Sequence, residues 1–299
     1  MFVIKFRKVF YAISVIIIAL SAYSFFTYGL NLGIDFKGGS ILEVEYSNTP
    51  DTGIISQKVA SQKLGVFSLR QTGEKGIILR TRTLTEPERV ALTSEIIKGD
   101  NTATIKRFDS VGPVLGEELR AKATMSMVYV ILAIILFITF VFRKVSKPVA
   151  SWKYGVVAII ALLHDIIVPV GVFSYLGHFQ GVEVDSLFVT ALLVVLGFSI
   201  HDTIVVFDRT RENLHKNEKE KVKKSFEEVV SNSVSQTFTR SINTSLTTLI
   251  SLAVLYYFGP EATKHFSLAL LIGITVGTYS SIFIGSPLLV TLEKLQKKN

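Results

Sequence analysis

The chain has 299 residues, of which 49% are hydrophobic and 19% charged, and its formal net charge is +8. Long apolar stretches alternate with short basic clusters, which is typical of a membrane protein and unusual for a soluble domain. Loops at cytoplasmic membrane ends are enriched in Lys and Arg, so the basic excess does not call for a nucleic-acid partner. The absence of cysteine excludes disulfides, thiolate metal sites and cysteine nucleophiles in this chain.

The first predicted element is a spanning helix at about residues 9–28, because roughly 20 apolar residues are needed to cross a bilayer. Lys5, Arg7 and Lys8 precede it, so a cleaved signal peptide is an alternative. No clear small-residue cleavage site follows the apolar run. We therefore predict an uncleaved anchor over residues 1–29.

Residues 30–123 are predicted to form a folded domain. Alternating and helical apolar patterns indicate a strand at 41–46, a helix at 52–64, strands at 66–71 and 77–82, a helix at 85–98 and a strand at 103–108. Thr85 and Glu88 are spaced as a capping box at the start of the second helix. The order βαββαβ predicts a small ferredoxin-like α/β sandwich. It holds no constellation of nucleophile and base, which favours a binding or lever domain over an enzyme.

Residues 124–299 contain five further predicted spans, at about 125–142, 152–176, 186–207, 242–258 and 266–292. The charged segment 209–239 carries apolar residues at helical spacing, and it predicts an amphipathic helix lying along the membrane surface. The fold class is therefore a membrane α-helical bundle of six transmembrane helices with a small α/β extracytoplasmic domain.

Orientation follows from the flanking charges, because Lys and Arg concentrate on the cytoplasmic side. One set of span ends carries basic clusters, as at Lys5 to Lys8 and at Lys294 to Lys298, while the short loops on the other side carry few. Both termini are predicted to be cytoplasmic, with residues 30–123 on the other side. The predicted location of the protein is the cell (inner) membrane.

Polar residues inside spans are informative, because a charge at mid-bilayer costs at least ~2.5–3.5 kcal/mol. They occur in the third, fourth and fifth spans: His164, Asp165, His201, Asp202, Arg240, Asn243 and Thr244. Arg240, Thr244 and Thr248 are four residues apart and share one helix face.

A proton path is the functional hypothesis for these residues, since a buried carboxyl group beside an arginine can take and release a proton as helices move. The alternatives are a structural ion pair or polar seam, an Arg240 that snorkels to the interface, and histidines that only pack. A metal site is not favoured, because the adjacent His and Asp residues point about 100° apart. No catalytic triad or phosphate loop appears, so neither an enzyme nor a cofactor is predicted.

The sixth span carries Gly273, Gly277, Ser281 and Gly285 four residues apart. Such a stripe of small residues predicts close helix packing.

Several segments together resemble one family. Residues 32–39, LGIDFKGG, resemble the GIDFxGG motif of the SecD/SecF family, and residues 111–119 and the pair His164-Asp165 match further family segments. Residues 202–213, DTIVVFDRTREN, are very close to the SecF signature DTVVVFDRIREN, and residues 240–245 resemble its fifth-span motif. His201 departs from the family, which more often has Asn there. The signature favours SecF over SecD.

The resemblance implies an RND-type membrane fold, RND being the resistance-nodulation-division superfamily, in which six helices form half of a twelve-helix unit and SecD supplies the other half. It implies that the complex joins the SecYEG channel and uses the proton-motive force to help export preproteins after the steps driven by SecA. YajC is a further candidate partner. The family's proton-path residues fall on Asp202, Arg240 and Thr244.

The loop with Asp35, Gly38 and Gly39 is predicted to be a hinge or packing joint, with a plain tight turn as the alternative. Two other functions stay open from the sequence. One is an RND-type transporter of lipids or small molecules, and the other is a scaffold that only stabilises a complex.

Overall fold

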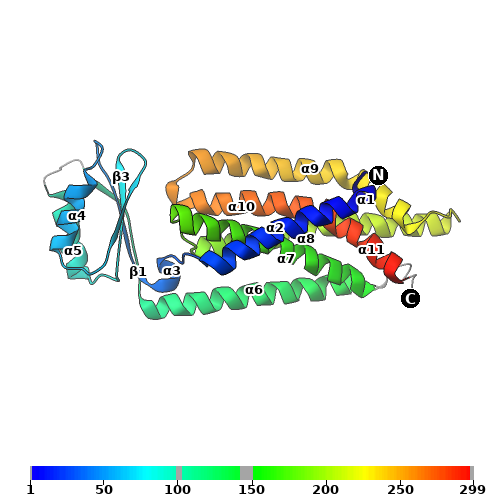
Figure 1. Cartoon of the computed structure of the whole chain (residues 1–299), viewed down its shortest axis with the longest axis horizontal. Coiled ribbons are helices and arrows are strands. Elements are labelled where there is room, and N and C mark those ends of the chain that lie inside the picture. Colours follow the sequence, from blue (N-terminus) through cyan, green and yellow to red (C-terminus); the bar gives the residue numbers. More distant parts are fainter. Residues whose placement is uncertain (1, 99–102, 142–150, 297–299) are drawn as a thin grey trace. The chain divides into compact units, whose positions relative to one another are not determined.

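The computed structural model describes residues 2–98, 103–141 and 151–296. It divides into two compact units (Figure 1), an α/β unit of Leu32–Thr124 and a helical unit of Met1–Asn31 with Met125–Asn299. Arg143, Lys144, Lys147 and the end of the predicted second span lie outside the described residues, as do residues 99–102 and 297–299.

The α/β unit is a ferredoxin-like sandwich, as the sequence predicts. Its elements are α3 (Ile34–Lys37), β1 (Gly39–Glu45), α4 (Thr52–Ser61), β2 (Ser68–Thr72), β3 (Gly76–Thr81), α5 (Glu86–Ile97) and β4 (Thr104–Val111). The sheet order is β2-β3-β1-β4 with every pair antiparallel. Figure 1 shows α4 and α5 together on one face of the sheet. Val44, Ile77 and Leu79 of the central strands are buried in one core with Val59 and Leu92 of these helices.

Helices α4 and α5 begin at side-chain caps, which satisfy backbone N–H groups that have no partner within the helix. The Asp51 carboxylate accepts from the Gly53 N–H at 2.8 Å. The capping box predicted at Thr85 and Glu88 is confirmed, since each residue's side chain accepts from the other's backbone.

The two glycines of the GIDFKGG loop lie in a crowded joint. Gly38 and Gly39 have φ of +76° and +132°, in the region that favours glycine. A Cβ on Gly38 would lie 2.9 Å from the Cα of Pro113, and one on Gly116 would lie 3.0 Å from the Gly38 nitrogen. The loop therefore packs its backbone directly against the chain that starts the next long helix.

The helical unit is built from long apolar helices. They are α1 (Phe2–Lys5), α2 (Arg7–Tyr28), α6 (Pro113–Val141, which belongs to this unit from Met125), α7 (Ser151–Gln180), α8 (Ser186–Lys219), α9 (Phe226–Phe258), α10 (Glu261–Ser280), the π-helix η1 (Ser281–Gly285) and α11 (Ser286–Gln296). Among the described residues, six segments are long and apolar enough to cross a membrane, with α10, η1 and α11 forming one of them. This number confirms the predicted fold class.

The helices of this unit are buried to very different extents. In the apolar window of α7, and likewise of the α10–α11 segment, 61% of the residues are buried, whereas in α6 the share is 6% and in α9 it is 11%. Helices α7, α8 and α10 pack closely against one another. They form the interior of the unit, whereas the apolar windows of α6 and α9 are largely uncovered by it.

The segment 209–239 differs from the prediction of a helix along the membrane surface. Helix α8 continues to Lys219, and α9 runs without a break from Phe226 into the fifth span. Phe226, Val229 and Val230 are buried within the helical unit. Hydrophobic periodicity shows only that one face avoids water, so it cannot distinguish a helix on a bilayer from a helix packed on other helices.

Candidate functional site

Asp202 of α8 is a buried carboxylate with only one of its two oxygens hydrogen-bonded. The side chain is 6% exposed. Its Oδ1 accepts from the Ser241 hydroxyl of α9 at 2.6 Å. Its Oδ2 is buried and has no hydrogen-bond partner among the described residues. Because a buried polar atom without a partner costs about 1–3 kcal/mol, this oxygen is a place where a proton or another donor would stabilise the structure.

The polar side chains of α9 between Arg240 and Ser251 fall into three groups. Ser241 and Ser245 face the unit, and Ser245 accepts from Thr278 of α10 at 2.6 Å. A second group, Thr247, Thr248 and Ser251, donates to carbonyls of its own helix one turn earlier. Such hydroxyls need no other partner and can face lipid.

Arg240, Asn243 and Thr244 form the third group, which we call the open polar face of α9. All three are exposed. Within the described part of the chain, their side chains have no hydrogen bond or ion pair. Polar and charged groups of a spanning helix face a protein partner or water rather than lipid. The open polar face therefore marks a side of the helical unit that faces a protein partner or water rather than lipid.

The predicted proton-path residues near Asp202 differ in whether they contact its carboxylate. Ser241, which the sequence analysis did not select, makes the contact expected of Arg240. Arg240 is the preceding residue, on the open polar face, and His201 is exposed on the α8 surface next to Asp202. The chain therefore supplies the carboxyl group, while its predicted cationic partner lies toward the uncovered side.

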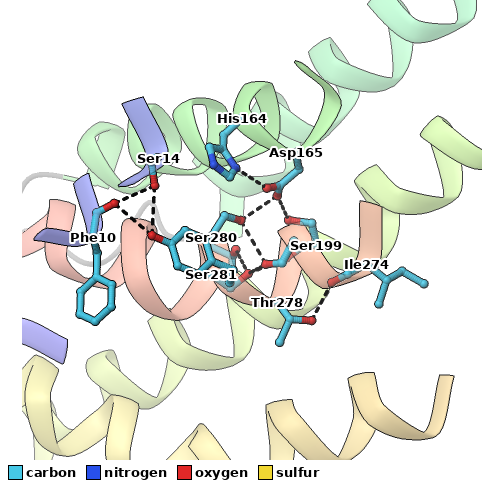
Figure 2. A network of polar contacts seen from close by, with 12 residues as sticks. Phe10, Ser14, His164, Asp165, Ser199, Ile274, Thr278, Ser280 and Ser281 are labelled. Carbon is cyan, nitrogen blue, oxygen red and sulfur yellow. Dashed lines mark hydrogen bonds and ion pairs between the residues drawn. The ribbon is translucent and has the colours of Figure 1, made fainter. Parts of the chain in front are cut away.

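Asp165 of α7 forms a second, fully buried cluster (Figure 2). Its Oδ2 accepts from Ser199 of α8 at 2.5 Å and from Ser280 of α10 at 2.8 Å. Its Oδ1 lies 3.0 Å from Nδ1 of His164. Three helices thus converge on one carboxylate. His164 keeps a buried Nε2 with no partner among the described residues.

Further hydroxyl groups of α10 and η1 make contacts beside this cluster (Figure 2). The Ser281 hydroxyl donates to the Ser199 carbonyl at 3.3 Å and lies 2.9 Å from the Thr203 hydroxyl. Toward α2, the Tyr279 hydroxyl donates to the Phe10 carbonyl at 3.0 Å. Contacts around Asp165 thus link α7, α8 and α10, and a separate group of contacts links α10 to α2.

The small-residue stripe lies where α10 crosses α8. A Cβ on Gly273 would lie 2.3 Å from Val195, and one on Gly277 would lie 3.0 Å from Ser199. Ser281 opens the π-helix η1, and its carbonyl accepts from Ser286 at 3.1 Å. Single π-turns are rare and concentrate at functional sites. The helix thus changes its pitch just beyond the residues that contact Asp165.

Ser199, Ser241 and Ser280 were not singled out from the sequence, because serine is common in membrane helices and carries no charge. One signal was available for two of them: Ser199 lies about one turn before Asp202, and Ser241 adjoins Arg240. Ser280 has no such neighbour. In the described ranges, no group of three or more His, Asp or Glu side chains could hold a metal ion.

Comparison with known proteins identifies the family of this chain. The family model described as protein export membrane protein SecD/SecF, C-terminal, matches residues 92–295. The SecD/SecF GG motif matches residues 23–50, which include Gly38 and Gly39.

Full-length relatives agree with this match. Protein translocase subunit SecF of Thermobaculum terrenum is 42% identical, over 97% of this chain and 93% of the relative. The subunit of the same name from Pseudomonas aeruginosa is 35% identical, over 96% and 89%.

Among solved structures, SecDF of Thermus thermophilus, a translocon-associated membrane protein, superposes with a TM-score of 0.82 at 29% identity. The match covers 97% of this chain and 38% of the SecDF chain. A super-membrane-facing form of SecDF gives a TM-score of 0.69 at 29% identity. The chain belongs to the SecD/SecF family of protein export membrane proteins, and within that family to SecF.

Proposed function

We propose that this chain is the SecF subunit of a complex with SecD that uses the proton-motive force to promote the export of preproteins through the SecYEG channel, with the chain's termini in the cytoplasm. Asp202 is the proton-carrying group. The observation that supports this role is its second oxygen, which is buried and lacks a donor within the described residues. Protonation supplies that oxygen with a hydrogen, and loss of the proton leaves it dependent on a donor from elsewhere.

The open polar face of α9 supports the second part of the proposal. Arg240 and Thr244 adjoin Ser241, which bonds to Asp202, yet they face away from the helical unit. A partner that covers α9 encloses both residues together with any water between them. We assign this partner to SecD, since the family's solved SecDF chain is much longer than this one. The proton path then runs along the seam between the two subunits.

The energy is sufficient for such a role. One proton moving down a potential of 100 mV releases about 2.3 kcal/mol. That amount biases a conformational equilibrium of a few kcal/mol several-fold or more. Helix α6 starts at Pro113, against the glycine joint of the α/β unit, and continues as one helix to Val141 in the helical unit.

The test compares two Asp→Asn substitutions on α8 in proteoliposomes that carry SecYEG and SecD. Asp202→Asn keeps the shape of the side chain and removes its titration, whereas Asp208→Asn changes an exposed residue that pairs with Arg211 at 3.1 Å. We expect Asp202→Asn to abolish the stimulation of export by an imposed proton gradient. Asp208→Asn is expected to retain it.

A scaffold without proton coupling predicts a different result. If Asp202→Asn assembles with SecD and still responds normally to the gradient, the proton role is wrong. Co-purification of SecD and SecY with the chain from mild detergent tests the partners separately. Their absence would instead favour an independent transporter.

A further inference from the structure

A groove lies at the end of the helical unit that carries the chain's first helical turn. Its volume is about 980 Å³, and it is formed by residues 4–9 on one side and residues from the range 222–232 on the other. Contacts of α1 with α9 bring these two segments together (Figure 1). The groove is separate from both buried carboxylates.

Five cationic residues line this groove: Lys5, Arg7, Lys8, Lys223 and Lys224. Arg7 pairs with Glu227 at 3.3 Å. The four lysines are exposed, and none of them forms an ion pair within the described residues. Four uncompensated positive charges from two distant parts of the sequence therefore surround one hollow.

The two acidic residues of the groove are already engaged. Glu227 accepts from Arg7 and also pairs with Lys294 of α11. The Glu228 carboxylate accepts from the Ser225 N–H at 2.9 Å as part of the cap of α9. Both carboxylates would still repel an anion at short range. Because each is bound to its own donors, the lysines keep the excess positive charge of the groove.

The N-terminal wall of the groove is held in place by packing. Val3 and Ile4 of α1 are each only 2% exposed, and the Arg7–Glu227–Lys294 contacts link α2, α9 and α11. Beside these anchored residues, Phe6 and Val9 are 40% and 54% exposed. The groove thus has cationic walls and an apolar margin at the end of a spanning helix.

We propose that this groove binds the phosphate headgroup of an anionic phospholipid from the leaflet on the side of the chain's N-terminus. Lysines act as point charges for phosphate, Ser231 and Asn232 supply neutral donors in the lining, and Phe6 and Val9 contact the acyl chains. Basic pockets between spanning helices are suited to phospholipid headgroups. The general enrichment of positive charge at cytoplasmic loops explains why lysines occur here, but it requires no hollow between them.

The experiment uses the full chain in nanodiscs made of equal parts phosphatidylglycerol and phosphatidylcholine, with retained lipids counted by native mass spectrometry. Lys223→Gln/Lys224→Gln removes two charges from the groove. The matched control, Lys219→Gln/Lys221→Gln, removes two charges from the end of α8 and the residues that follow it, without touching the groove lining. Lys5 and Lys8 are left unchanged because they also help to set the orientation of the first span.

We expect the wild type to retain phosphatidylglycerol in preference to phosphatidylcholine. Since a basic residue near an anionic surface contributes about fivefold to binding, the groove variant should lose at least about tenfold of this retention. Lys223→Arg/Lys224→Arg should keep it, which separates lost charge from lost folding. Added inorganic phosphate should not displace the lipid, because the acyl contacts are part of the site.

Three results would overturn the proposal. One is the absence of phosphatidylglycerol preference in the wild type, a measurement that needs no variant. Another is an equal loss in the groove pair and the control pair, which would indicate non-specific surface charge. The third is displacement by inorganic phosphate at millimolar concentration, which would indicate a site for free anions.

Discussion

The two buried carboxylates of the helical unit have contrasting surroundings. Asp165, on the α7 side, has contacts from Ser199, Ser280 and His164 that satisfy both of its oxygens. Asp202, on the α9 side, has one contact and one orphan oxygen. Both residues stood out in the sequence for the same reason, as acids inside apolar spans. The structure separates a carboxylate that joins three helices from one that keeps an oxygen without a hydrogen-bond partner among the described residues.

The helices around each carboxylate show the same contrast. Around Asp165 the helices are closely packed, and α7 is largely buried. Beside Asp202, α9 is largely uncovered and displays unpartnered polar side chains. A group that must exchange protons needs access and a changeable environment, and a group that fixes helix positions needs neither. The four predictions below test this difference, from the largest expected effect to the smallest.

The tightest packing on the α7 side is at Gly171, where an added Cβ would lie 2.3 Å from the Cβ and 2.4 Å from the Cα of Ser21 on α2. Because backbone atoms block the space, Gly171→Ala should destabilise the helical unit by about 3 kcal/mol, the upper part of the range for overpacking. Thermal unfolding in detergent measures the effect.

Gly285→Ala is the matched control, since the nearest atom to its added Cβ would be 3.6 Å away. It should leave the melting temperature nearly unchanged. Equal melting temperatures for the two variants would mean that α2 does not pack on α7 as described.

Removal of the two carboxylates should rank the variants in one order for stability and in the opposite order for function. Asp165→Ala breaks two interhelical contacts and one with the adjacent His164 and should cost about 2 kcal/mol, whereas Asp202→Ala breaks one interhelical contact and should cost about 0.6 kcal/mol. Unfolding in detergent gives both values. For export driven by a proton gradient the order should reverse, with Asp202→Ala the more damaging. If both variants rank the same way in the two assays, the proposed division of roles is wrong.

The open polar face of α9 should react as a surface in contact with water or protein. The chain has no cysteine, so single cysteines can be placed without background. Thr244→Cys should react roughly tenfold faster with a water-soluble maleimide than Leu136→Cys on the apolar surface of α6, because the reactive thiolate requires a polar environment. Leu136 is 71% exposed in the isolated chain. A difference between the two reaction rates would therefore show that Leu136 faces lipid and Thr244 faces water. Addition of SecD should protect Thr244→Cys alone, and similar rates without SecD would contradict the assignment.

Glu88 in the α/β unit is a carboxylate in water, for comparison with the two buried ones. Its hydrogen bonds with Arg82, and then with Thr85, lower the pKa of Glu88 to about 2. A lowered pKa stabilises the folded state above the unfolded pKa of about 4.3, and this contribution is lost as the pH falls from about 4.5 to 2. Glu88→Gln should reduce the dependence of unfolding on pH in that window. The effect should be small because the ion pair of Glu88 with Arg82 lies at the surface, with both side chains partly exposed. An unchanged pH profile in the variant would show that other groups dominate acid unfolding.

The sequence by itself determined the six spans, the βαββαβ order of the α/β unit and the two acids worth examining. These features depend on local composition and period, since apolar length sets a span and alternation sets a strand. The glycine stripe was visible for the same reason. Gly171 stands in no such pattern, and its contact with Ser21 was not predictable.

Tertiary structure decided which polar groups meet. Ser241 bonds to Asp202 across 39 positions in the sequence, and Ser280 bonds to Asp165 across 115. Such pairings depend on the packing of whole helices, which no local pattern encodes. The course of residues 209–239 was decided in the same way, because an apolar stripe specifies that it will be buried but not what will cover it. The open polar face of α9 was likewise decided by tertiary structure, because it consists of the polar side chains that remain exposed when the opposite side of that helix packs against the unit.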